Sequence, residues 1–134
     1  MKLNQDNMCF ACGEDNPISL GLEFESIDEN RIRTYFTPGP EHQGYGEIMH
    51  GGLVSTLLDE VMAKVIYFQG RVGLTASMET RFKYPVPIGT NLEVVGKIKA
   101  EKGNFVFTEA VLSGVEGKVY AHGEGKFKVR EQND

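Results

Sequence analysis

Long apolar runs are absent from this sequence of 134 residues. A membrane-spanning helix needs about 20 consecutive apolar residues, and the segment Met1–Asn7 also lacks the apolar region of a signal peptide. We therefore expect a cytoplasmic protein with no membrane partner. Internal repeats and low-complexity segments are absent too, and the length suits a single domain spanning residues 1–134.

A basic excess is absent as well, because 14 Lys and Arg residues stand against 19 Asp and Glu residues, for a formal net charge of −5. Nucleic-acid binding requires a basic surface, so nucleic acid is not an expected partner. The charge is uneven: residues 1–79 carry 5 basic and 12 acidic side chains, whereas residues 80–130 carry 9 and 5. The basic second half offers contacts for a polyanionic ligand, or simply solvated strand edges. The candidates are Arg81, Lys83, Lys97, Lys99 and Lys126.

Cysteine is scarce, and the only two cysteines, Cys9 and Cys12, form a C-x-x-C pair. A structural zinc site needs four ligands, but the three histidines are scattered and no second ligand pair exists at the usual spacing. A redox pair usually opens a helix, whereas residues 13–17 favour turns. We therefore predict a structural turn within an N-terminal segment, residues 1–19, and no metal site. A metal shared between subunits stays open.

One stretch has a sustained helical pattern. Its apolar residues recur at three-and-four spacing, at positions 53, 54, 57, 58, 61, 65 and 68, which predicts an amphipathic helix from Leu53. The helix is expected to stop near Gln69, with Gly70 as its C-cap. Because the remaining sequence favours strands, we expect this single helix to form the core around which a sheet wraps.

The two adjacent acids of this helix, Asp59 and Glu60, are expected to differ. On a helical wheel Asp59 lies roughly 160° from the centre of the apolar face. Glu60 lies on the flank, four residues before Lys64, which predicts an ordinary surface ion pair. The neighbours of Asp59 on the back face are small or apolar, so we expect that face to be covered as well. These neighbours are Ser55, Met62, Ala63 and Ile66.

Glycines precede the helix in the sequence His50-Gly51-Gly52. The first N–H groups of a helix have no partner within the helix, and together with the helix dipole they favour an oxyanion or a polarised carbonyl. Glycine also allows a ligand to approach the backbone closely. The alternative is a tight turn that His50 caps.

Distance along the helix separates Gly51 from Asp59. Eight residues correspond to about 12 Å of helix, whereas an oxyanion donor and a base or nucleophile must both lie within about 3 Å of one reacting group. If both residues act, two copies of the helix must lie antiparallel across a two-fold axis. A covered back face is what such a dimer requires.

Alternating patterns predict the strands. Residues 22–26 and 32–36 are expected to form a hairpin that turns at Glu29–Asn30. Later strands are expected at 92–100, 105–113 and 119–129, followed by a frayed tail at 130–134.

A longer strand is expected after Gly73, half-buried and with alternating faces. One face would carry Leu74, Ala76, Met78, Thr80, Phe82 and Tyr84, and the other Thr75, Ser77, Glu79, Arg81 and Lys83.

Three segments together resemble the hotdog-fold acyl-CoA thioesterases of the phenylacetyl-CoA thioesterase (PaaI-like) branch. They are His42–Asp59, Cys9–Leu22 and Phe82–Gly89. The resemblance implies an α+β fold in which an antiparallel sheet wraps around one long helix, and a dimer or tetramer of such chains. It further implies acyl-CoA as substrate and no cofactor, since coenzyme A is part of the substrate.

The same resemblance implies roles for single residues. Gly51 would supply the oxyanion N–H, and Asp59 would act as nucleophile or general base. Gln43 would touch the thioester and Ser77 would hold the water, while the position of a further polar residue in some relatives is occupied here by Ala63. The residues expected to bind substrate are His50, Gly52, Arg81 and Lys83.

Two other functions stay open. A non-catalytic hotdog domain would bind acyl-CoA without hydrolysing it, although a carboxylate facing a buried interface is costly unless it is used or paired. A hydratase or dehydratase would need a catalytic histidine, for which His50 is the candidate. The acyl group is also open, because the residues that suit an apolar pocket also suit a plain core. These residues are Tyr45, Met49, Met62, Tyr67 and Phe82.

Overall fold

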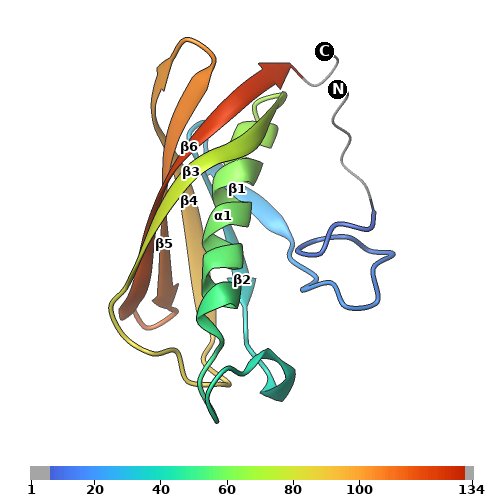
Figure 1. Cartoon of the computed structure of the whole chain (residues 1–134), viewed down its shortest axis with the longest axis vertical. Helices are drawn as coiled ribbons and strands as arrows, with labels where there is room; N and C mark the ends of the chain where they lie inside the picture. The colour runs from blue at the N-terminus through green and yellow to red at the C-terminus, as the bar shows by residue number, and fades with distance from the viewer. Residues whose placement is uncertain (1–6, 132–134) are drawn as a thin grey trace.

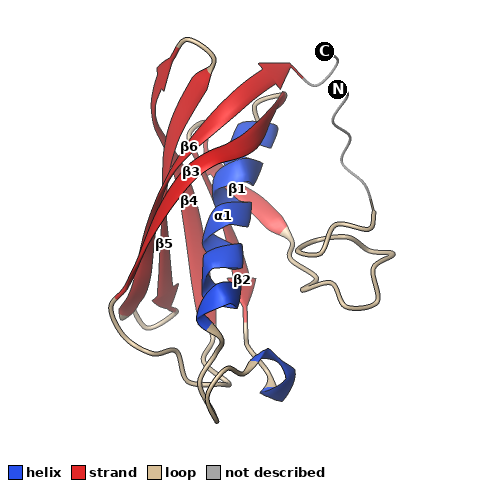
Figure 2. Cartoon of the chain, viewed as in Figure 1, coloured by secondary structure: helices blue, strands red, loops and turns tan. Residues whose placement is uncertain are grey.

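The computed structural model describes residues 7–131 and contains one long helix and six strands in that range (Figure 1). Figure 2 shows the helix lying against one face of the sheet, with a short 3-10 turn below it. The elements are β1 (Phe24–Asp28), β2 (Arg31–Phe36), η1 (Pro40–His42), α1 (Gly51–Tyr67), β3 (Arg71–Phe82), β4 (Leu92–Lys102), β5 (Phe105–Gly114) and β6 (Val119–Glu131).

All six strands form one sheet in the order β1-β2-β4-β5-β6-β3, and every pair is antiparallel. The sheet curves around α1, which contacts β2 to β6 (Figure 1). The expected α+β architecture is therefore confirmed. The strand that follows the helix, β3, lies at one edge of the sheet beside α1.

The sheet surrounds more of α1 than the wheel predicts. Val54, Leu57, Leu58, Val61 and Val65 are buried as expected. Two residues of the back face, Met62 and Ile66, are fully buried by the sheet of the same chain, and Phe68 lies beyond the helix end with 47% of its surface exposed. The apolar face is thus centred closer to Met62 than the spacing indicates. No helix in residues 7–131 is long and apolar enough to cross a membrane.

A close approach between sheet and helix depends on Gly96 in β4. A Cβ added there would lie 2.6 Å from the Val61 carbonyl oxygen, so any other residue would push the strand away from the helix. The burial of α1 against β4 therefore requires glycine at this position.

The predicted turns are confirmed, and their ends are adjusted by one or two residues. The first hairpin turns at Glu29–Asn30, and Gly103 makes the β4–β5 turn with a φ of 62°. The helix ends at Tyr67 and its C-cap is Phe68, so the prediction of Gly70 as the C-cap was wrong; Gly70, with a φ of 83°, lies in the turn that follows. At the other end, β6 includes Arg130 and Glu131, so the frayed tail expected at 130–134 was wrong for these two residues; residues 132–134 lie outside the described range.

The described part of the N-terminal segment before β1, residues 7–23, has turns and contains neither helix nor strand. The Gly13 N–H donates to the Cys9 carbonyl at 2.8 Å, and the Leu22 N–H donates to the Ala11 carbonyl at 3.1 Å. Ala11 and Leu22 are buried in the core. The segment is therefore packed onto the domain from Cys9 onward.

Candidate functional site

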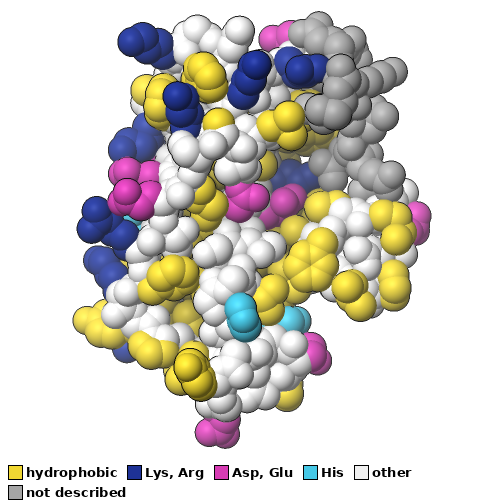
Figure 3. Space-filling view, in the orientation of Figure 1, with side chains coloured by type: hydrophobic (Ala, Val, Ile, Leu, Met, Phe, Trp, Pro, Cys, Tyr) yellow, Lys and Arg dark blue, Asp and Glu magenta, His cyan; other side chains and the backbone are white. Residues whose placement is uncertain are grey.

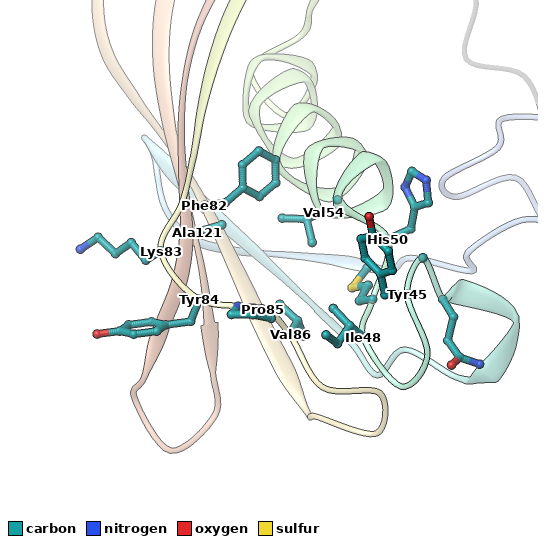
Figure 4. A pocket seen from close by; sticks show the side chains of 14 residues that line it. Tyr45, Ile48, His50, Val54, Phe82, Lys83, Tyr84, Pro85, Val86 and Ala121 are labelled. Atoms are coloured by element: carbon teal, nitrogen blue, oxygen red, sulfur yellow. The ribbon is translucent and has the colours of Figure 1, made fainter.

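A cavity of about 770 Å³ opens at the start of α1, between the preceding loop and the end of β3 (Figure 4). Most of its lining is apolar, and its polar groups come from the loop and the helix start. The lining residues are Gln43, Gly44, Tyr45, Ile48, Met49, His50, Gly51, Val54, Phe82, Lys83, Tyr84, Pro85, Val86 and Ala121. A cavity of this size suits a small organic ligand.

Hydrogen bonds fix the loop that forms one wall of the cavity. The Gly44 N–H donates to the Ile48 carbonyl at 3.0 Å, and the Met49 N–H donates to the Val86 carbonyl at 2.8 Å. The Gln43 amide donates to the Pro40 carbonyl at 2.8 Å and accepts from the Glu47 N–H. Gln43 therefore lies at the cavity with its amide engaged in the loop, and its contact with a thioester stays a prediction.

The first two residues of α1 differ in the use of their N–H groups. His50 is the N-cap, and its Nδ1 accepts a hydrogen bond from the Gly52 N–H at 2.8 Å. No residue between 7 and 131 accepts from the Gly51 N–H, which is the first of the helix. The capping role of His50 is thus observed, and it leaves Gly51 as a donor at the cavity.

Asp59 lies elsewhere on the helix, half-buried against β3. Its Oδ1 accepts a hydrogen bond from the Thr75 hydroxyl at 2.7 Å. Asp59 does not line the cavity at Gly51, which lies about 12 Å away along α1. Within one chain Gly51 and Asp59 are therefore too far apart to contact the same reacting group, as the sequence predicts.

A bulge in β3 explains why Thr75 rather than Ser77 reaches Asp59. Thr75 pairs with the fully buried Phe127, so it faces the helix, whereas Ser77 pairs with Lys126 on the other face. The register shifts between them, so strict alternation fails at Ala76. The expected shared face of Thr75 and Ser77 was wrong, and the partner of Asp59 was missed because alternation carries no sign of a bulge.

Of the two basic residues expected to bind substrate, Lys83 lines the cavity and Arg81 does not. Arg81 is exposed and pairs with Glu79 at 3.2 Å. Lys83 lies at the cavity rim, and Figure 4 shows its side chain directed away from α1. The structure therefore brings Gln43, His50 and Gly51 together, with Lys83 at the edge of the group.

The second acid of the helix, Glu60, is not at the surface as expected. The side chains of Glu60 and Lys64 are 18% and 9% exposed, because the N-terminal segment lies over this flank. Burial raises the pKa of Glu60, and the Lys64 ammonium at 4.0 Å opposes that shift. The predicted ion pair of Glu60 and Lys64 is thus present, but the prediction that it lies at the surface was wrong. Figure 3 shows acidic side chains where α1 meets the N-terminal segment.

Both cysteines reach the same carboxylate. The Sγ atoms of Cys9 and Cys12 lie 3.9 Å and 3.8 Å from Glu60 Oε1. Burial, followed by the hydrogen bond with Cys9, raises the pKa of the Cys12 thiol to about 11. Lys64 also lies over the rings of Phe24 and Tyr67, 5.8 Å and 4.9 Å from their centres.

A family model described as the thioesterase superfamily matches residues 46–121. Among curated proteins, the acyl-coenzyme A thioesterase THEM4 of Xenopus laevis is 33% identical over 109 residues, which cover 78% of this chain and 48% of that protein. The chain thus spans about half the length of the curated relatives it matches.

Solved structures confirm the hotdog fold. The thioesterase superfamily protein RHA08564 is 26% identical with a TM-score of 0.85, and the match covers 91% of this chain and 60% of that one. The PaaI protein of the E. coli phenylacetic acid degradation operon is 20% identical with a TM-score of 0.77, over 81% and 83% of the two chains.

A hypothetical thioesterase protein from Streptococcus pneumoniae, solved with coenzyme A, is 17% identical with a TM-score of 0.78, over 83% of this chain and 90% of that one. Two single mutants of that protein are also solved. In one, alanine replaces an aspartate, and in the other, alanine replaces a threonine sixteen positions after that aspartate.

Proposed function

Because this chain belongs to the thioesterase superfamily, we propose that it hydrolyses an acyl-CoA thioester to a free acid and coenzyme A. The observation that carries this proposal is the Gly51 N–H, a donor at the positive end of α1 that lines an apolar cavity. A thioester carbonyl that accepts from this N–H is polarised, and the oxyanion of the tetrahedral intermediate is stabilised at the same place.

Asp59 supplies the second part of the chemistry in this proposal. Its carboxylate removes a proton from water or attacks the carbonyl itself. The Thr75 hydroxyl holds Oδ1 at 2.7 Å and so fixes the orientation of the carboxylate. The reaction uses no cofactor, because coenzyme A enters as part of the substrate.

Relatives support both parts of the proposal. THEM4 is named an acyl-coenzyme A thioesterase, and the pneumococcal structure contains coenzyme A. The aspartate and threonine replaced in the pneumococcal mutants have the same separation as Asp59 and Thr75. This match favours Thr75 over Ser77 as the hydroxyl beside the acid.

The site in this proposal is shared by two copies of the chain. Since β3 is the edge strand beside α1, its free N–H and C=O groups can pair with β3 of a second copy. Within one chain, Phe82 lies near Gly51, and Thr75 lies near Asp59. Antiparallel pairing of two β3 strands about Met78 therefore brings Gly51 of one copy toward Asp59 of the other.

Thiol release from a panel of aliphatic and aryl acyl-CoA substrates tests the proposal. The wild-type protein should turn over at least one substrate, and Asp59→Asn should lower kcat/KM by about 100-fold or more while remaining folded. Asp28→Asn, at an exposed residue paired with Arg31, is the matched control and should keep full activity. If no substrate is hydrolysed but acyl-CoA raises the melting temperature, the protein is a binding module instead.

A further inference from the structure

A second group of reactive side chains lies on the covered flank of α1, away from the cavity at Gly51. Cys9, Cys12 and Glu60 each offer one ligand atom, and these three atoms lie within 4.8 Å of one another. The cysteines come from the N-terminal turn and the glutamate from the helix. We propose that Cys9, Cys12 and Glu60 bind a zinc ion that fastens the N-terminal segment to α1. This inference does not depend on the thioesterase activity.

The distances between the ligand atoms fit a tetrahedral zinc ion. With Zn–S near 2.3 Å and Zn–O near 2.1 Å, a tetrahedral site places sulfur and oxygen ligands about 3.6 Å apart. The observed distances from Glu60 Oε1 are 3.9 Å to Cys9 Sγ and 3.8 Å to Cys12 Sγ. Both distances are therefore within a few tenths of an ångström of the tetrahedral value, and the two Sγ atoms lie within 4.8 Å of each other. Water completes the fourth position.

The chemistry of the three ligands favours zinc over other divalent ions. Two thiolates select soft or borderline metals, whereas magnesium and calcium prefer oxygen ligands. Zn²⁺ with two thiolates and one carboxylate carries a net charge of −1. The Lys64 ammonium, 4.0 Å from Glu60 Oε1 on the same half-buried flank, balances that charge.

The turn that carries the cysteines has a backbone that only glycine allows. A Cβ at Gly13 would lie 2.2 Å from the Asn7 carbonyl oxygen and 2.5 Å from the Cys9 nitrogen. The Gly13 N–H closes the turn by donating to the Cys9 carbonyl at 2.8 Å. Cys9 and Cys12 are thus held on one side of a tight turn, directed at Glu60.

The sequence favoured a structural turn over this site, because no second ligand pair follows the two cysteines at the usual spacing. The third ligand lies 48 residues after Cys12, on a helix that the fold places against the turn. The zinc ion would also fasten the helix next to Asp59, the neighbour of Glu60. Loss of the ion would therefore loosen the N-terminal segment first.

Zinc binding can be measured on the tag-free, reduced and chelator-stripped full chain. Competition with a chromophoric chelator should give one zinc per chain with a dissociation constant below about 1 μM. Cys9→Ser and Cys12→Ser should each weaken binding by about 100-fold, and Glu60→Gln by about 10-fold. Glu109→Gln, in the more exposed cluster of Glu109, His122 and Glu124, is the matched control and should leave zinc affinity unchanged.

Cobalt substitution tests the ligands even if a variant fails to fold. Co²⁺ added to the wild-type protein should give the near-ultraviolet charge-transfer absorption of cobalt–thiolate bonds, and zinc should abolish it. The proposal is overturned if the reduced wild-type protein binds no zinc at micromolar concentration, including the case in which Cys9 and Cys12 act only as a disulfide. It is also overturned if folded Cys9→Ser or Cys12→Ser protein retains wild-type affinity.

Discussion

Asp59 and Glu60 are adjacent on α1, yet their carboxylates have opposite surroundings. Glu60 is covered by the N-terminal segment of its own chain, with Lys64 and two thiols around it. Asp59 lies at the sheet edge, where its partner Thr75 is exposed. One step of about 100° around a helix separates the two environments. The Glu60 flank of the helix is therefore covered within the chain, whereas the Asp59 flank lies at the exposed edge of the sheet.

Removing the Gly51 N–H is expected to lower the catalytic rate more than any other change at the proposed shared site. Proline is tolerated at the first helical position, and His50, with φ −59° and ψ 130°, has the backbone that a residue before proline adopts. Gly51→Pro should therefore preserve the helix and lower kcat by about 100- to 1000-fold, the effect of losing one oxyanion donor.

Gly51→Ala is the matched control, because it keeps the N–H and its Cβ would meet Phe82 at 3.7 Å, an ordinary contact. Steady-state rates measure kcat for both variants, and circular dichroism shows whether the helix is preserved. Equal rates for Gly51→Pro and wild type would rule out Gly51 as the oxyanion donor.

Mixing two inactive variants tests whether the active site lies within one chain or is shared by two chains. A dimer of one Asp59→Asn chain and one Gly51→Pro chain has one site with both groups intact and one site with neither. After unfolding and refolding a 1:1 mixture, random pairing should restore about one quarter of wild-type activity. Each variant refolded alone is the control, and no recovery in the mixture would show that the two residues do not act across an interface.

Thr75 and Ser77 provide a smaller test of the same flank. Thr75→Val keeps the shape of the side chain but removes the hydroxyl that donates to Asp59 Oδ1, so kcat should fall by about 10-fold. Thr75→Ser should restore most of the loss. Ser77→Ala, beyond the bulge and opposite Lys126, should change kcat less than twofold. The reverse order of effects would favour Ser77 as the residue that holds the water.

Local sequence patterns were enough to predict part of the proposed site at Gly51 and Asp59. The helix, its glycine start and the distance from Gly51 to Asp59 all follow from residues within one continuous segment. The choice between Thr75 and Ser77 does not, because the bulge arises from pairing with β6, about fifty residues later. Alternation in a single strand has no information on the register of its neighbour.

The covered flank was less predictable for the same reason. An i to i+4 pair of Glu60 and Lys64 has the same sequence pattern whether it is solvated or buried. Its burial depends on the turn at Cys9–Cys12, which packs there through long-range contacts of the N-terminal segment. Tertiary contacts of this kind also moved the helical face toward Met62 and Ile66.

Removing the ammonium of Lys64 is expected to give the smallest effect and to test whether the covered flank depends on its ion pair. In zinc-free protein, Lys64→Met leaves Glu60 buried without this cation, so the free energy of unfolding should fall by about 1–2 kcal/mol. Adding Glu60→Gln should recover part of the loss, because the double variant no longer buries an unpaired charge. Urea denaturation after chelation measures both effects.

Lys118→Met is the control for the aromatic contacts of Lys64. Lys118 also lies over two rings, 4.5 Å and 5.2 Å from the centres of Tyr84 and Tyr120, but it is exposed. Its replacement should change stability by less than about 0.5 kcal/mol. If Lys64→Met were equally mild, the N-terminal segment would be held by its apolar contacts at Ala11 and Leu22, and the two flanks of α1 would differ in packing rather than in charge.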